Sequence, residues 1–170
     1  MSAPDWPGSG GGSSHDGPPY AGGWGGGLVQ IQASGVVTLN GVIKADGTLR
    51  SGTYGGGGSG GGIYISCAMF SGAGTLTANG RDGAAYAGVG GGGRIAIACT
   101  NCLGWSGVTQ AKPGTGGYAP GWHGTLYVRD ARFLSPVSTT NQLFQLWGVP
   151  AWSPASLWMS NSYLGLIDPE

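Results

Sequence analysis

The feature that most constrains the fold is a run of glycines followed by an apolar alternation, which occurs three times at nearly constant spacing. The copies read GGGLVQIQ from Gly25, GGGIYIS from Gly60 and GGGRIAIA from Gly91, and a weaker fourth copy, HGTLYVRD, begins at His123. Internal repetition at a period of about 20 to 50 residues indicates a repeat architecture, because one such unit is too small to bury its own apolar face. The sequence therefore predicts that successive copies stack on one another.

Alignment of the copies places apolar residues of equal parity in shared columns. The first column consists of Val29, Ile63, Ile95 and Leu126, and the second consists of Ile31, Ile65, Ile97 and Val128. Equivalent residues of stacked parallel strands lie about 4.8 Å apart. We therefore expect two ladders of branched side chains in the core.

A second motif follows each of the first three strands, as GVIKADG from Gly41, GTLTANG from Gly74 and GVTQAKPG from Gly107. A short alternation that ends in a turn residue and glycine is typical of a strand closed by a turn. No stretch between residues 28 and 128 has the period and length of a helix. The predicted fold class is all-β, as a short parallel β-helix or solenoid of about three to four coils with polyglycine returns and a C-terminal capping or assembly segment.

Glycine accounts for 39 of the 170 residues, and its runs have two interpretations. If the strands stack, their connections must stack too, and only residues without a Cβ let extended backbones approach that closely. A solvated linker is the more common role of a Gly/Ser run. The packed interpretation is favoured because the runs recur in register with the strands.

The low charge of the chain excludes two classes of partner. Only 8% of the residues are charged and the formal net charge is zero. Nucleic acids and anionic membranes are bound chiefly by clustered Lys and Arg, and no stretch approaches the roughly 20 apolar residues of a membrane-spanning helix. We expect neither nucleic acid binding nor membrane insertion. Residues 1–12 lack the basic and apolar regions of a secretory signal.

Composition divides the chain into three parts. Residues 1–24 form a Gly/Pro-rich N-terminal segment or cap, residues 25–134 the repeats, and residues 135–170 an apolar C-terminal part. This last part either covers the exposed end of the stack or joins one copy to the next. Its candidate assembly residues are Leu143, Phe144, Trp147, Trp152 and Trp158.

Candidate catalytic groups are few. An enzyme that acts on polysaccharides from a β-helical scaffold needs clustered carboxylates as acid, base or calcium ligands. The turn column that could supply them reads Asp46, Asn79 and Lys112, while Asp82 and Asp130 lie elsewhere. These positions favour a role as surface turn residues. The sequence predicts no catalytic residue, no metal site and no cofactor.

Two of the three cysteines share a core-facing column. Cys67 and Cys99 each lie four residues after the first apolar column, where stacked strands would bring their Cα atoms close enough for a disulfide. Two buried thiols are an equal alternative. Cys99 and Cys102 also form a CxxC, which by itself is a weak metal or redox signal. The redox state of all three stays open.

Several aromatic residues lie in the glycine-rich connections. Trp24, Trp105, Tyr118 and Trp122 are candidates for stacking on a sugar ring. The favoured alternative is that they cover the space that glycine leaves, because a buried ring removes a large apolar area from water.

The order of these motifs resembles a known kind of module. GGGSGGGIYISCAMFSGAGTLTANG, followed by GGGGRIAIA, SGVTQAKPG and HGTLYV, is similar to the glycine-rich repeat modules of very large bacterial surface or secreted proteins, from about Gly8 to Val128. The resemblance implies an extracellular β-rich architecture and brings no enzymatic residues. We therefore expect a non-enzymatic structural or adhesive module that associates with itself through its ends into an oligomer or fibre. A glycan-binding adhesin domain is the alternative, and a β-helical polysaccharide-active enzyme ranks third.

Overall fold

The computed structural model describes residues 3–13, 20–49, 54–129, 143–147 and 163–167. These residues contain ten strands and no helix. The strands are β1 (Leu28–Gln32), β2 (Val36–Thr38), β3 (Val42–Lys44), β4 (Gly62–Gly72), β5 (Thr75–Thr77), β6 (Arg94–Trp105), β7 (Val108–Gln110), β8 (Thr125–Val128), β9 (Leu143–Trp147) and β10 (Tyr163–Ile167).

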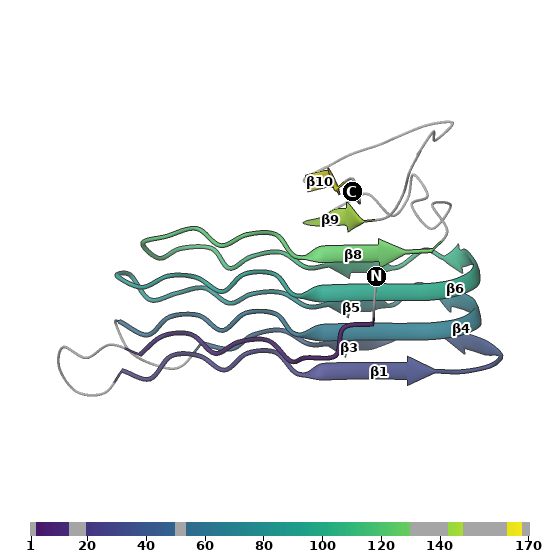
Figure 1. Ribbon diagram of the computed structural model, residues 1–170, viewed down its shortest axis with the longest axis horizontal. Helices are drawn as coiled ribbons and strands as arrows, with labels where there is room; N and C mark the ends of the chain where they lie inside the picture. The colour runs from purple at the N-terminus through teal and green to yellow at the C-terminus, as the bar shows by residue number, and fades with distance from the viewer. Residues whose placement is uncertain (1–2, 14–19, 50–53, 130–142, 148–162, 168–170) are drawn as a thin grey trace.

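The strands belong to two parallel sheets that lie at one end of an elongated molecule (Figure 1). The seven-stranded sheet has the order β1-β4-β6-β8-β9-β10, with β2 also paired to β4, and the three-stranded sheet has the order β3-β5-β7. Parallel neighbours require long connections that bring the chain back to the same edge. The glycine-rich parts of the repeats provide these connections.

The register of the larger sheet confirms both predicted ladders. Val29 pairs with Ile63, Ile63 with Ile95, and Ile95 with Leu126. The second column, two residues further on, pairs in the same way from Ile31 through Ile65 and Ile97 to Val128. Every member in β4, β6 and β8 is buried, whereas the two members in β1 are half-buried. The difference arises because no described strand pairs with the outer edge of β1.

Buried residues of both sheets form one apolar cluster. Leu76 of β5 joins the isoleucine ladders in this cluster, and so do Ala45, Ala78 and Ala111, which follow the three short strands. At the far end of the sheets, Phe70 and Trp105 stack with their ring centroids 4.7 Å apart. A stacked aromatic pair contributes about 1 kcal/mol beyond the area that it buries.

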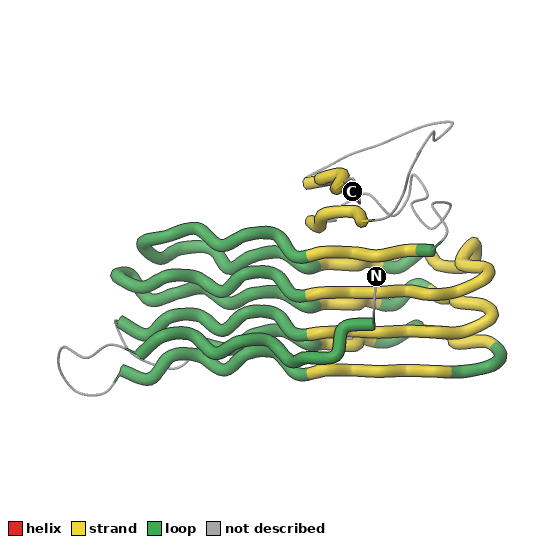
Figure 2. Tube along the Cα trace, viewed as in Figure 1, coloured by secondary structure: helices red, strands yellow, loops and turns green. Residues whose placement is uncertain are grey.

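The other half of the molecule consists of glycine-rich segments that contain no strand (Figure 2). Four of them, here called the first to fourth glycine segments, lead into β1, β4, β6 and β8 and comprise residues 20–27, 54–61, 86–93 and 118–124. Three return segments, which follow β3, β5 and β7, comprise residues 45–49, 78–82 and 111–115.

Backbone hydrogen bonds connect each glycine segment to its neighbours in more than one direction. The Gly26 N–H donates to the Ser59 carbonyl at 2.8 Å, whereas the Gly61 N–H donates to the carbonyl of Ala45, in a return segment, at 2.7 Å. The pattern recurs three residues away, where the Gly23 N–H donates to the Gly56 carbonyl at 2.8 Å. A period of three residues is that of the polyproline II helix. The prediction that the glycine runs pack, rather than serve as solvated linkers, is confirmed.

The predicted parallel β-helix of three to four coils is wrong. The described strands form two parallel sheets at one end of the molecule, and the larger sheet continues beyond the repeats into β9 and β10. The glycine runs were expected to form a wall of each coil, but they contain no strand. Without side chains to separate them, glycine backbones can hydrogen-bond to neighbours all around, which favours this packing over a flat sheet. The all-β class and the parallel pairing agree with the structure.

Residues 4–12, here called the N-terminal segment, run from beside the strands, where the Gln30 side chain of β1 donates to the Pro4 carbonyl at 3.4 Å, into the glycine half (Figure 1). The Gly8 and Gly11 N–H groups donate to the first glycine segment, at the carbonyls of Gly26 and Gly23, both at 2.8 Å. In return, the Ser59 N–H of the second glycine segment donates to the Ser9 carbonyl at 3.0 Å. The N-terminal segment thus lies between the first and second glycine segments and is bonded to both.

Candidate functional site

The turn column of Asp46, Asn79 and Lys112 forms a chain of hydrogen bonds between repeats. One oxygen of Asp46 accepts the Asn79 N–H at 2.7 Å and the other accepts the Thr77 hydroxyl at 3.0 Å. Asn79 Oδ1 then accepts the Lys112 N–H at 3.0 Å. Asp46 and Asn79 therefore each satisfy a backbone donor of the next repeat. Lys44 Nζ, 3.9 Å from Asp46 Oδ2, adds an ion pair.

Asp82 has a similar role in the return segments. Its Oδ1 accepts the Thr115 N–H at 2.6 Å and the Thr115 hydroxyl at 3.1 Å. Asp46 and Asp82 both line a surface hollow of about 240 Å³, together with Arg81 and Lys112. Both carboxylates line the hollow and also accept hydrogen bonds from the backbone of the next repeat. Asp130 lies outside the described residues.

Replacement of Asp46 by alanine should lower the free energy of unfolding by about 1–3 kcal/mol, because the Asn79 N–H and the Thr77 hydroxyl both lose their acceptor. Urea denaturation of Asp46→Ala measures the loss. Asp5→Ala, which removes an exposed carboxylate, is the matched control and should change the stability by less than about 0.5 kcal/mol. Equal stability of the two variants would contradict a structural role of the turn column.

The disulfide joins Cys99 to Cys102, whose Cα atoms are 6.0 Å apart, and not Cys67 to Cys99. Cys67 and Cys99 are nevertheless register partners in β4 and β6, as the alignment predicts. The β4–β6 register shifts just beyond them, between Met69 and Ser71, and Cys102 is buried like Cys99. A bulge re-aims side chains in this way. Cys67 is a free, buried thiol, and burial raises its pKa, so it is protonated and unreactive at neutral pH.

The four aromatic candidates for glycan stacking do not form one site. Trp105 is only 2% exposed and stacks on Phe70, so its assignment as a sugar-stacking residue is wrong. Its place at the end of the long strand β6 turns the ring into the core. Trp24, Tyr118 and Trp122 are 65%, 85% and 83% exposed, so their rings do not cover the glycine layer as the favoured alternative supposed.

A stack of tyrosines is an arrangement that the sequence reasoning missed. Tyr20, Tyr54 and Tyr86 begin the first three glycine segments, and consecutive ring centroids are 5.5 and 5.4 Å apart. Their sequence spacing equals that of the paired strands, which is the signal that could have revealed the stack. Stacked rings of this kind add to the cohesion of successive repeats.

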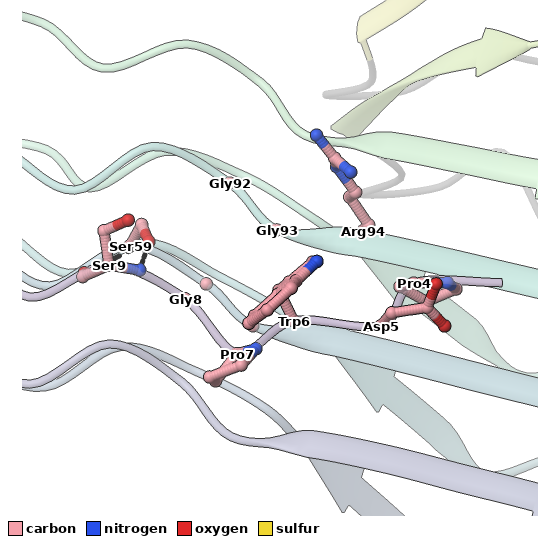
Figure 3. A pocket seen from close by; sticks show the side chains of 12 residues that line it. Pro4, Asp5, Trp6, Pro7, Gly8, Ser9, Ser59, Gly92, Gly93 and Arg94 are labelled. Atoms are coloured by element: carbon pink, nitrogen blue, oxygen red, sulfur yellow. Dashed lines mark hydrogen bonds between the residues drawn. The ribbon is translucent and has the colours of Figure 1, made fainter. Parts of the chain in front are cut away.

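Two adjoining hollows lie beside the N-terminal segment. One of about 320 Å³ lies between this segment and the start of β6 (Figure 3), where Trp6 projects from the segment on the side of Gly93 and Arg94. The other, of about 400 Å³, extends along the glycine segments past Tyr54 and Gly88. Glycine backbone forms much of their walls, and Asp5 and Arg94 are the charged side chains that line the first of them.

The candidate assembly residues of the C-terminal part are placed only in part. Leu143, Phe144 and Trp147 belong to β9, which pairs with β8 and so covers its outer edge. Trp152 and Trp158 lie outside the described residues. At the opposite end of the sheet, β1 has an open edge among the described strands.

No three His, Cys, Asp or Glu side chains converge within the described part of the chain. Burial lowers the pKa of His123, which is therefore neutral at neutral pH. None of the described segments forms a helix with the length and apolar character needed to cross a bilayer. Comparison of the chain with protein-family models, with curated proteins and with solved structures finds no match.

Proposed function

We propose that this chain is a non-catalytic structural module that associates with further copies of itself through the edges of its seven-stranded sheet. The observation that carries the proposal is the incomplete burial of the first repeat. Val29 and Ile31 are half-buried, while their register partners Ile63 and Ile65 are fully buried. The core ladder is therefore cut off at β1 rather than completed there.

The open edge of β1 is suited to pairing with another strand. An unpaired strand presents a row of free N–H and C=O groups, and proteins that stay monomeric usually protect such an edge with charge, proline or a covering element. The edge strand reads LVQIQ and carries neither a charge nor a proline. Lys44, at the end of β3, is the one charged residue in β1, β2 and β3. Another copy can thus approach without bringing like charges together.

The two ends of the larger sheet differ, and this favours a growing assembly over a closed dimer. β1 is the last strand at one end and β10 at the other, and all pairings between them are parallel. Pairing of β10 in one copy with β1 in the next would continue the same parallel sheet. Because such a contact is heterologous, it need not close and can produce a fibre.

The turn carboxylates and the disulfide support the non-catalytic and extracellular parts of the proposal. Asp46 and Asp82 are engaged in hydrogen bonds that connect repeats. A disulfide such as Cys99–Cys102 persists in oxidising surroundings outside the cytosol. An extracellular or cell-surface location is also what the resemblance to glycine-rich repeat modules implies.

Light scattering coupled to size-exclusion chromatography at several concentrations tests the proposal. We expect the wild-type chain to form species that grow with concentration, and Ile31→Lys to remain a monomer, because a charge at the end of the core ladder opposes stacking of another copy. Gln30→Lys, which places the same charge on an exposed side chain of β1, should assemble like the wild type. A wild-type monomer at all concentrations, or assembly of Ile31→Lys with unchanged circular dichroism, would exclude the β1 edge.

A glycan-binding adhesin is the second candidate, favoured by the exposure of Tyr118 and Trp122 on the fourth glycine segment. Exposed flat rings can stack on the apolar face of a sugar. If this candidate is correct, binding on a glycan array should be lost in Trp122→Ala and kept in Ile31→Lys. Self-association through β1 predicts the opposite pattern, in which Ile31→Lys loses assembly and Trp122→Ala keeps it.

A further inference from the structure

The packing of the N-terminal segment defines what an extended chain needs in order to bind between two glycine segments. Its Gly8 and Gly11 N–H groups donate to the carbonyls of Gly26 and Gly23, and its Ser9 carbonyl accepts the Ser59 N–H. The Gly12 carbonyl of the N-terminal segment likewise accepts the Gly56 N–H at 3.0 Å. Two carbonyls of the first glycine segment and two N–H groups of the second are thus the recognition groups.

The second requirement is the absence of a Cβ at two positions of the first glycine segment. A Cβ on Gly22 would overlap the Gly11 carbonyl, and a Cβ on Gly25 would overlap the Gly8 carbonyl. Both positions face the bound segment, three residues apart, as the polyproline II period requires. The packing of the N-terminal segment against these two positions explains why both residues are glycine.

The third and fourth glycine segments repeat this arrangement, and no other described segment lies between them as the N-terminal segment lies between the first two. Val89, Gly92 and Trp122 occupy the places of Gly23, Gly26 and Ser59, as their identical bonds to the next segment show: the Gly92 N–H donates to the Trp122 carbonyl at 2.9 Å, as the Gly26 N–H does to the Ser59 carbonyl. Within the described residues, the carbonyls of Val89 and Gly92 accept no hydrogen bond and the Trp122 N–H donates none. The Ala119 N–H, which corresponds to the Gly56 N–H, also donates to no described backbone carbonyl, so all four recognition groups are unpaired among the described residues.

Glycine also occupies the two corresponding positions of the third glycine segment, although nothing described packs on them. Gly88 and Gly91 correspond to Gly22 and Gly25 by register. A Cβ on Gly88 would meet no described atom within 4 Å, and a Cβ on Gly91 would make only an ordinary 3.6 Å contact with the Trp122 carbonyl. The packing of the described chain therefore gives no reason for glycine at either position, whereas a bound extended chain would.

The intermediate position, between the second and third glycine segments, differs at one residue. There Ser59 stands where the N-terminal segment requires Gly25, and its hydroxyl already accepts the Ser9 N–H at 2.7 Å. The Ser59 side chain thus occupies the place of a chain that would bind at this position. This difference leaves the third and fourth segments as the open site, which consists of residues 88–92, Ala119 and Trp122.

We propose that the open site binds an extended, uncharged polypeptide segment that has glycine at every third residue, in the manner in which residues 8–12 bind between the first and second glycine segments. The bound segment donates two N–H groups to the carbonyls of Val89 and Gly92, and two of its own carbonyls accept the N–H groups of Trp122 and Ala119. A side chain at every third position of the ligand would collide with the fourth segment, as a Cβ on Gly8 or Gly11 would collide with the second. The ligand class is therefore a glycine-rich chain, in contrast to the sheet edge used in the proposed self-association.

The experiment is a titration of the full-length ¹⁵N-labelled protein with a blocked peptide of the sequence PGSGGGS, which is that of residues 7–13. Because the peptide makes few contacts, we expect a dissociation constant on the order of 1 mM. Amide shifts should move at Trp122 and at the residues after Val89 and Gly92. The control peptide PASGAGS has alanine at the positions of Gly8 and Gly11 and should cause no shift.

The double variant Gly88→Ala/Gly91→Ala separates an effect on peptide binding from an effect on folding stability. It should unfold at the wild-type urea concentration, because the Cβ on Gly88 meets no described atom and the Cβ on Gly91 makes only an ordinary contact, and its affinity for the peptide should fall at least about tenfold. Gly12→Ala, which also adds a Cβ in open space but outside the site, should bind like the wild type. The proposal would be overturned if about 10 mM peptide, on the order of ten times the expected dissociation constant, caused no shifts. It would also be overturned by shifts confined to the first and second glycine segments, or by undiminished binding of the peptide to the double variant.

Discussion

Gly60→Ala should destabilise the protein by about 3 kcal/mol or more, a large part of the total stability of a domain. A Cβ at Gly60 would overlap the Ala78 carbonyl and approach the Gly93 nitrogen, which lies 2.6 Å from the Cβ position. Both are backbone atoms that are held by hydrogen bonds to other segments, since the Gly93 N–H donates to that same carbonyl at 2.7 Å. The clash cannot be relieved by rotation of a side chain, so two segments must move apart.

Gly88→Ala is the matched control, because it makes the same change in the next glycine segment where a Cβ meets no described atom within 4 Å. The urea midpoints of the two variants and the wild type provide the comparison. We expect Gly60→Ala to unfold at a much lower urea concentration and Gly88→Ala to unfold within about 0.5 kcal/mol of the wild type. If the two variants lose the same stability, the glycine half is not packed in the way described above.

Ile65→Ala should lower the free energy of unfolding by about 2–5 kcal/mol, because it removes buried methyl groups and leaves a cavity between two neighbours of the ladder. Ile65 is fully buried and lies between Ile31 and Ile97 in the register. Ile31→Ala removes the same atoms from the half-buried edge strand, and the loss should be about half as large. Denaturation at low protein concentration measures both in the monomer.

The comparison between these two variants also bears on self-association. If copies assemble through β1 as proposed, Ile31 becomes a buried member of a continuous ladder, and the cost of Ile31→Ala should rise with protein concentration toward that of Ile65→Ala. A difference between the two variants that is independent of concentration would be evidence against assembly through β1.

The apolar columns were predictable because they depend only on local pattern and repetition. The spacing of the glycine and strand motifs fixes which residues are equivalent, and parallel pairing of equivalent residues follows from a chain that returns to the same edge. The register of Val29, Ile63, Ile95 and Leu126 therefore agrees with the alignment. The same logic brings Asp46, Asn79 and Lys112 into one column.

The disulfide and the environment of Trp105 were not predictable from that pattern. Parity along β6 would place Cys102 on the side opposite to Cys99, but the register shift in the β4–β6 pair accompanies burial of both, and they bond. Trp105 lies in a connection by sequence, yet β6 extends to it and places its ring on Phe70. Both outcomes depend on the pairing of distant segments.

The sequence by itself determined the all-β class, the parallel stacking of the repeats and the identity of the core ladders, because a period of two within strands and a constant spacing between them leave few ways to bury the apolar residues. The tertiary structure alone decided how the glycine runs pack. A glycine backbone has no side chain to bias it toward a sheet, so its neighbours select its conformation and its hydrogen bonds. For this reason the structure has two parallel sheets joined to a glycine layer, where the sequence suggested a β-helix.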